Sequence, residues 1–201
     1  GEQVAIEITA NKKDFARANI VEILSASAHR VAPPCKFVAA GCGGCSWQHL
    51  DVSQHMPTKA AIVTEALRRT AKISENDVAR LVKVGGSVSA HASRTTLRMA
   101  VLPTGKLGFR RANSNDLIET SPCLVAHDLL NEMIATARVK NATEVTLRCG
   151  ASSGDRGVWL HDEHGRGQIT GLPKNVGVGI ESLVHEVVNG VRLRVMMTSF
   201  F

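Results

Sequence analysis

The sequence contains no tyrosine, and aromatic side chains make up only 3% of its 201 residues. A protein that binds single strands mainly by stacking bases on aromatic rings would usually carry more of them. No apolar run approaches the roughly 18 residues that a membrane-spanning helix needs, and no basic, then apolar, then small-residue leader opens the chain. We therefore expect neither a membrane span nor a retained secretory signal, and we expect a cytoplasmic protein.

The remaining composition is that of a folded protein, because 44% of the residues are hydrophobic and 21% are charged. The length suits one domain, or one domain and part of another. The chain starts with Gly1 rather than Met and stops at Phe200-Phe201, directly after an expected hairpin. We expect both ends to be cut from a longer protein, and we expect a monomer.

Acidic residues are absent between Asp77 and Asp116, although the chain as a whole carries 18 of them against 24 lysines and arginines. A localised positive field attracts polyanions, of which nucleic acid is the usual one. The alternative is an ordinary solvated face. The uncompensated cations of this interval are Arg80, Lys83, Arg94, Arg98, Lys106, Arg110 and Arg111.

The five cysteines do not suit a closed disulfide framework, because their number is odd. Cys35, Cys42 and Cys45 form a C-x6-C-x2-C run, in which neighbouring glycines let the backbone wrap tightly. Cys123, Cys149 or a histidine could supply a fourth ligand. Four thiolates suit a structural zinc or an iron–sulfur cluster. Unligated thiols are the remaining alternative.

The hydrophobic pattern predicts an α+β fold, an antiparallel β-sheet with a few packed helices. A polar–apolar alternation predicts a hairpin over residues 2–24, and helical spacing predicts amphipathic helices over 51–73, with its apolar stripe in the core, and 124–137. Asn189-Gly190 between two apolar runs is the strongest hairpin signal. Further strands are expected over 144–149 and 157–161, and a loop over 162–179.

A basic hairpin is expected between residues 82 and 111. Alternation places Arg94, Thr96 and Arg98 on one face of a strand, with Leu97 and Met99 among the residues of the other face. Residues 103–105 form a turn, and 106–111 return. Phe109 is either core or a stacking platform, and core is favoured.

The run CKFVAAGCGGCSWQH, from Cys35 to His49, resembles the iron–sulfur motif of the RNA uracil-5-methyltransferases. Residues 93–98 (SRTTLR) and 105–111 (GKLGFRR) are similar to the arginine-bearing hairpin of that family, and Ser121-Pro122-Cys123 falls where it places a fourth cluster ligand. The chain departs from the family in two places. Six residues rather than five separate Cys35 from Cys42, and Thr96 stands where a further arginine is frequent.

The resemblance implies a division of the chain. Residues 1–34 would be the end of an OB-like TRAM β-barrel, and 35–199 an iron–sulfur and RNA-recognition domain with a cysteine-rich cluster loop. A Rossmann-like catalytic domain that binds S-adenosylmethionine would follow residue 201. A 4Fe–4S cluster, with zinc as the alternative, would bind Cys35, Cys42, Cys45 and Cys123. We favour a structural over a redox role for it. His49 would either support a cluster sulfur or simply pack.

The partner implied by the resemblance is a ribosomal or transfer RNA stem-loop, held at its phosphates by arginine. In this family a cysteine thiolate attacks C6 of uracil and C5 then accepts a methyl group. We find no glycine-rich turn after a strand to bind the methyl donor, and Cys149 lies in a strand-like run with no adjacent base. We therefore expect this segment alone to be inactive, or else to be a non-enzymatic, zinc-stabilised RNA-binding module. The expected RNA contacts are Arg94, Arg98, Lys106, Arg110 and Arg111.

Overall fold

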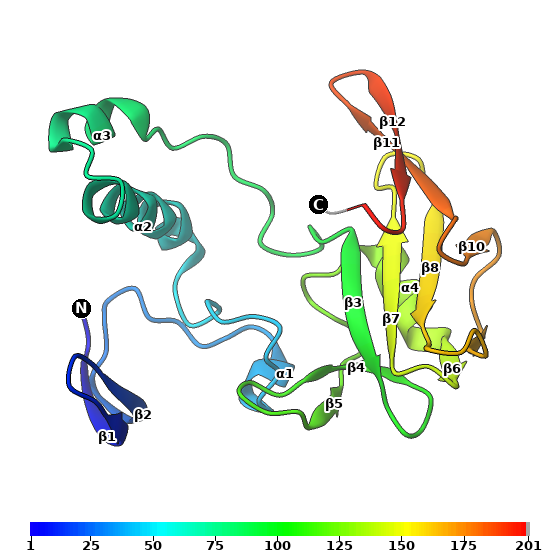
Figure 1. Ribbon diagram of the computed structural model, residues 1–201, viewed down its shortest axis with the longest axis horizontal. Coiled ribbons are helices and arrows are strands. Elements are labelled where there is room, and N and C mark those ends of the chain that lie inside the picture. Colours follow the sequence, from blue (N-terminus) through cyan, green and yellow to red (C-terminus); the bar gives the residue numbers. More distant parts are fainter. Residues whose placement is uncertain (200–201) are drawn as a thin grey trace. The chain divides into compact units, whose positions relative to one another are not determined.

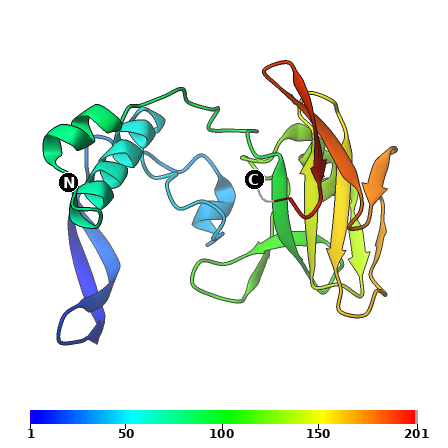
Figure 2. The same cartoon turned by 45° about the horizontal axis from the view of Figure 1, so that its top comes forward.

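The computed structural model describes residues 1–199 and divides into two compact units. The N-terminal unit comprises Gly1–Pro34 and Trp47–Gly85, and the sheet unit comprises Cys35–Ser46 and Gly86–Phe201. Figures 1 and 2 show the course of the chain through both units. The cysteine loop, Cys35–Ser46, therefore belongs to the same unit as Cys123.

The N-terminal unit begins with the expected hairpin, formed by β1 (Gln3–Asn11) and β2 (Ala16–Ser25). The two strands pair antiparallel with three register shifts and form a sheet of their own. Apolar side chains of both strands are exposed, including Ile6, Ile20 and Val21. The alternation that predicts a half-buried hairpin is present, but within the described residues neither strand carries a buried side chain.

The rest of this unit is helical. A 3-10 turn, η1 (Val52–Gln54), leads into α2 (His55–Arg69), and α3 (Glu75–Leu81) follows. Asp51 accepts a hydrogen bond from the backbone N–H of Ser53 and so caps η1. The helix starts at His55, which leaves Pro57 in the first turn, where a missing N–H costs nothing. The predicted burial of the α2 stripe is wrong in the described chain, since α2 has no buried residue.

The sheet unit is built on a six-stranded mixed sheet in the order β10-β8-β7-β3-β4-β5. Only the β10–β8 pair is parallel. Two small sheets, β11-β12 and β6-β9, and two helices complete it. Its elements are α1 (Lys36–Ala39), β3 (Thr96–Val101), β4 (Leu107–Arg110), β5 (Leu117–Glu119), α4 (Asp128–Thr136), β6 (Arg138–Lys140), β7 (Glu144–Cys149), β8 (Arg156–His161), β9 (Gln168–Thr170), β10 (Val176–Val178), β11 (Leu183–Val188) and β12 (Val191–Met196).

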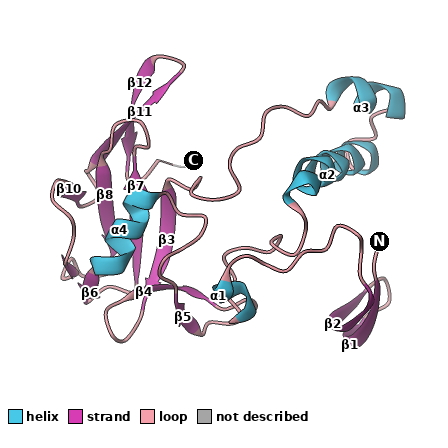
Figure 3. Cartoon of the chain, turned by 180° about the vertical axis from the view of Figure 1, so that it is seen from behind, coloured by secondary structure: helices cyan, strands magenta, loops and turns pink. Residues whose placement is uncertain are grey.

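The core lies between α4 and one face of β3, β7 and β8, and Figure 3 shows α4 in front of that face. The helix contributes Leu130 and Met133, and the central strands contribute Met99, Leu147 and Val158. Each of these side chains is less than 2% exposed. The predicted antiparallel sheet with packed helices is therefore present as an α+β arrangement, and alternation along β3 correctly separated Leu97 and Met99 from Arg98.

The predicted loop over 162–179 is wrong in part, because it contains β9 and β10. Each strand is three residues long and pairs with a strand distant in sequence, β6 or β8. Three residues are too few to show the period of a strand, so the glycine-rich composition of this segment predicted a loop instead. The three-residue strands β5 and β6 were not predicted for the same reason, and the seven-residue helix α3 was also not predicted. Asn189 and Gly190 both adopt positive φ, as the predicted tight hairpin between β11 and β12 requires.

Candidate nucleic-acid interface and cysteine loop

The face of the sheet opposite α4 is turned toward the viewer in Figure 1, and we call it the open face. Ala100, Glu144 and His161 stand in one row across β3, β7 and β8, and Arg98, Thr146 and Trp159 stand in the next. Cross-strand partners share a face because side chains alternate along each strand. Arg110 of β4 joins them, since its strand neighbour Gly108 pairs with Ala100.

Glu144 binds two arginines of the open face. Its Oε2 accepts from Arg98 Nε at 2.7 Å and Nη2 at 2.5 Å, and its Oε1 accepts from Arg110 Nη2 at 3.3 Å. Burial acts to raise the pKa of Glu144, but the two guanidinium groups outweigh it and lower that pKa. The carboxylate therefore stays charged, and the trio of two cations and one anion keeps a net charge of +1. Arg98 and Arg110 are 62% and 49% exposed and retain N–H donors for a ligand.

The cysteine loop is attached to the end of β4, the strand that carries Arg110. Gly43 N–H donates to the carbonyl of Arg110 at 3.0 Å, Ala112 N–H donates to the carbonyl of Gly41 at 2.9 Å, and the Arg111 guanidinium donates to the carbonyl of Ala40. A β-carbon at position 43 would lie 3.1 Å from the Arg110 oxygen, so glycine allows this approach. Folding the loop thus fixes the basic hairpin next to it.

An open pocket of about 480 Å³ lies where the loop meets the hairpin. Gly43 and Gly44 line one part of it, and Arg98, Arg110 and Arg111 line another. Guanidinium groups are suited to anionic oxygens, because each presents several N–H donors. Three of the five predicted contacts are therefore brought together at one pocket.

The other two predicted contacts lie elsewhere in the sheet unit. Lys106 forms an ion pair with Glu119 at 2.9 Å. Arg94 is exposed, and its backbone pairs with Val125 and His127 before β3 begins. Phe109 packs against the core, as the favoured interpretation of that side chain predicts.

The four cysteines expected to share one centre all lie in the sheet unit. Cys35, Cys42 and Cys45 are partly exposed, whereas Cys123 is 6% exposed. Burial raises the pKa of the Cys123 thiol, and the charges of Cys45 and Cys35 raise it further. The donor set suits a four-thiolate centre. Within residues 1–199, however, no group of three or more His, Cys, Asp or Glu has an arrangement that could hold a metal ion.

Asn131 of α4 positions the backbone of Cys123. Its Oδ1 accepts from Cys123 N–H at 2.9 Å, and its Nδ2 donates to the carbonyls of Cys123 and Ala126. Cys149 is the cysteine that lies outside the expected four-thiolate set. It is 3% exposed in β7, and burial raises the pKa of its thiol to about 11. A thiol held protonated in this way is a poor nucleophile, as expected for a structural cysteine.

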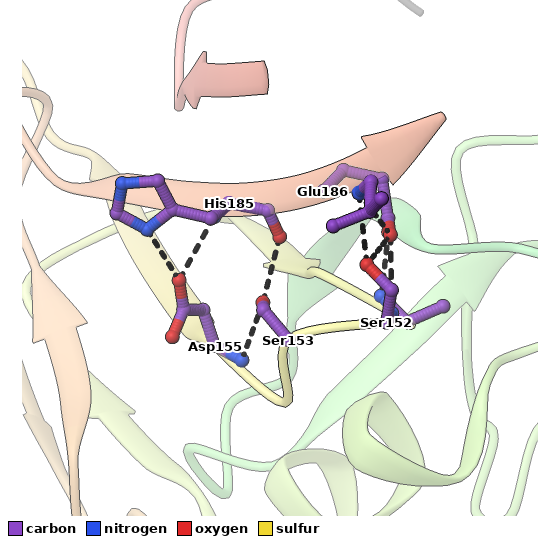
Figure 4. Close-up of polar contacts among 7 residues, drawn as sticks. Ser152, Ser153, Asp155, His185 and Glu186 are labelled. Carbon is purple, nitrogen blue, oxygen red and sulfur yellow. Dashed lines mark hydrogen bonds and ion pairs between the residues drawn. The ribbon is translucent and has the colours of Figure 1, made fainter. Parts of the chain in front are cut away.

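Ser153 and Asp155 of the turn between β7 and β8 lie beside His185 of β11 (Figure 4). Asp155 Oδ2 lies 2.7 Å from His185 Nδ1, but Ser153 Oγ donates to the backbone carbonyl of His185 rather than contacting its ring. A nucleophilic serine needs its base within hydrogen-bond reach, so this group is not arranged for catalysis. Next to it, Glu186 accepts from the backbone of Ala151 and Ser152. These side chains instead join the turn between β7 and β8 to β11.

Sequence analysis did not identify Asn131, Glu144 or Trp159 as members of a site. Each of these residues comes close to a predicted site residue only through the register of β3, β7 and β8 or through the docking of α4. A single glutamate at the start of a strand gives no local signal of its partners. The absence of acidic residues between 77 and 116 was the nearest clue, since it left the arginines to be balanced from another strand.

No protein-family model matches the chain. An RNA methyltransferase of unassigned role from Bdellovibrio bacteriovorus is 34% identical over 148 residues, which are 72% of this chain and 36% of that protein. A 23S rRNA uracil-C5-methyltransferase of Shewanella halifaxensis is 33% identical over 139 residues, 67% of this chain and 30% of that protein.

In fold, the chain is similar to the crystal structure of the Pyrococcus abyssi tRNA (uracil-54, C5)-methyltransferase in complex with S-adenosyl-L-homocysteine. The TM-score is 0.57 at 18% identity, over 100% of this chain and 54% of the other. The chain belongs to the RNA uracil-5-methyltransferase family. It spans about a third of the length of these curated relatives.

No helix within residues 1–199 is both long enough and apolar enough to cross a membrane.

Proposed function

We propose that this chain is the RNA-gripping, cluster-bearing part of an RNA uracil-5-methyltransferase. The observation that carries the proposal is the pocket in which the cysteine loop meets Arg98, Arg110 and Arg111. Guanidinium groups on a rigid strand hold phosphates in a fixed register, and phosphate contacts position an RNA without selecting its sequence. The RNA would be a ribosomal or transfer RNA stem-loop, as the names of the relatives suggest.

In this proposal residues 1–34 are the end of a TRAM domain and 35–199 form the central domain. The methyl-transfer site and the site for S-adenosylmethionine lie in residues that this chain does not include. The 201 residues alone therefore bind RNA but do not methylate it. The protein acts as a cytoplasmic monomer.

We propose further that Cys35, Cys42, Cys45 and Cys123 hold a 4Fe–4S cluster, for which zinc is the alternative. The bound group would join the loop near residue 40 to the segment before α4 and so rigidify the arginine-bearing strands between them. Asn131 supports Cys123, and Gly43 keeps the loop against Arg110. Methyl transfer consumes no electrons, so the role proposed for the cluster is structural.

Metal analysis of two cysteine variants tests the cluster. Anaerobically purified protein should be brown and contain about four iron atoms per chain. Cys123→Ala should lose that iron, whereas Cys149→Ala, an equally buried control, should keep it. One zinc in a colourless protein would support the zinc-stabilised module instead. Equal iron in the two variants would remove Cys123 from the site.

RNA titrations at several salt concentrations test the phosphate contacts. Arg98→Ala should weaken binding and lower the slope of log K against log salt by about 1, because one counterion-releasing contact is lost. Lys174→Ala removes an exposed cation of the same unit outside the pocket and should leave the slope unchanged. An unchanged slope in Arg98→Ala would argue against phosphate contact.

A further inference from the structure

The open face carries the sheet unit's only tryptophan, Trp159 of β8, and this side chain is partly exposed. It stands in the same row as Arg98, with Thr146 between them. One end of this face is closed, because the Arg148 guanidinium donates to the carbonyls of Met196 and Ser199 at 2.7 and 2.6 Å. Arg148 pairs with Gly157, and the rows of Trp159 and then His161 follow along β8, away from that cover.

The indole of Trp159 is held in place by a neighbouring ring. The centroids of Trp159 and His161 are 4.0 Å apart, with the ring planes tilted by 44°. His161 Nε2 lies 2.8 Å from Thr146 Oγ1, which fixes the imidazole. Burial and the positive charge of Arg98 lower the pKa of His161, so the ring is neutral near pH 7 and does not compete with the arginines for an anion. An aromatic surface fixed before binding loses little entropy when a ligand stacks on it.

Cations lie on the side of this aromatic pair toward β3 and β4. His161 is the cross-strand partner of Glu144, which in turn holds Arg98 and Arg110. Within one face, an aromatic platform is therefore next to guanidinium groups that carry a net charge of +1. A nucleotide has the matching pair of groups, a flat base and an anionic phosphate joined by a sugar. Single-stranded segments combine these two contacts on proteins, with the base on an aromatic ring and the backbone on cations.

We propose that the open face binds one unpaired RNA nucleotide, with its base stacked on Trp159 beside His161 and its phosphate on Arg98 and Arg110. This inference rests on the proposed RNA-binding function and adds to it a requirement for an unstacked base. A base inside a duplex is covered on both sides by its neighbours and cannot lie on the indole. The scarcity of aromatic residues agrees with a single stacking position rather than a platform for many bases.

The test uses fluorescence of the full 201-residue chain. Trp47→Phe leaves Trp159 as the only tryptophan, and a single-stranded RNA oligonucleotide should quench its emission as it binds. A fully paired duplex of the same sequence should bind with little quenching. Trp159→Leu, which keeps an apolar side chain, should weaken single-strand binding by about tenfold. Trp159→Phe, which keeps an aromatic face, should retain most of the affinity and also controls for misfolding.

Failure of this inference differs from failure of the proposed function. If Arg98→Ala weakens RNA binding while Trp159→Leu binds as the parent does, stacking is wrong and the RNA-binding function stands. If the parent chain binds neither oligonucleotide, both are wrong. Self-association that Trp159→Leu abolishes, with RNA affinity unchanged, would make the open face a protein contact and overturn the stacking proposal.

Discussion

The two units of this protein have similar apolar patterns along their strands but differ in what they bury. Among the described residues of the N-terminal unit, Val78 alone is buried, and Ile20, Val21 and Leu24 of β2 are more than 60% exposed. The sheet unit buries a contiguous core around α4, in which Leu130 and Leu147 are fully covered. Apolar burial contributes roughly 25 cal/mol per Å² to stability. The stability of the chain is therefore concentrated in the sheet unit.

The difference lies in the covering element and not in the strands. β3 alternates polar and apolar residues as β1 does, but β3 pairs on both sides and has α4 beneath it. β1 and β2 pair only with each other in the described chain. A two-stranded hairpin is at best marginally stable in water, so its apolar side chains contribute little until something covers them.

The largest expected effect comes from matched leucine truncations. Leu147→Ala removes a fully buried side chain and should reduce the free energy of unfolding by about 2–5 kcal/mol, since it leaves a cavity in a packed core. Leu24→Ala removes a side chain that is 62% exposed and should change that free energy by less than about 0.5 kcal/mol. Urea denaturation of both variants measures this contrast. Equal losses would mean that β2 is covered in solution.

Sequence could predict elements whose own residues show a period or a turn signal. The hairpin over β11 and β12, the helix α4 and the alternation of β3 were all correctly predicted. It could not predict that the α2 stripe would lack a partner, because an amphipathic pattern says that a face needs covering and not what covers it. The candidate site likewise contains residues that the sequence could predict and residues that it could not. Arginine spacing placed Arg98 on an outer face, whereas Glu144 reached it only through the pairing of β3 with β7.

Two glycine substitutions should give an intermediate effect. A β-carbon on Gly108 of β4 would lie 2.1 Å from the Ile118 carbonyl oxygen, so Gly108→Ala must push β4 and β5 apart. We expect a loss of about 1–3 kcal/mol. Gly85, at the end of the N-terminal unit, has nothing within 4 Å of the same position. Gly85→Ala should be neutral or slightly stabilising, because it restricts the unfolded chain. Thermal unfolding distinguishes the two, and equal behaviour would contradict the packing of β4 against β5.

The smallest effect concerns two carboxylates. Glu186 of β11 bonds the turn between β7 and β8, and Glu2 pairs with Arg30. Glu186 accepts from Ser152 Oγ and from the backbone of Ala151, and these bonds, that of the Ser152 hydroxyl first, lower its pKa below 4.5. Glu2 accepts from Arg30, which lowers its pKa to about 2. A carboxylate whose pKa is lower in the folded state contributes its stability above its unfolded pKa and loses it as the pH falls through the folded value.

Glu186→Gln should therefore cost about 1 kcal/mol at neutral pH, since it replaces charge-assisted hydrogen bonds by neutral ones. The difference from the parent should shrink as the pH falls below 4.5, where the parent carboxylate begins to take up a proton in the unfolded state. Glu2→Gln removes the partly buried ion pair with Arg30, and its pH dependence should extend to about 2. Glu181→Gln, at an exposed position of the sheet unit, serves as the control. Denaturation across this pH range measures all three, and a Glu186→Gln difference that stayed constant with pH would show that the carboxylate charge does not hold the turn to β11.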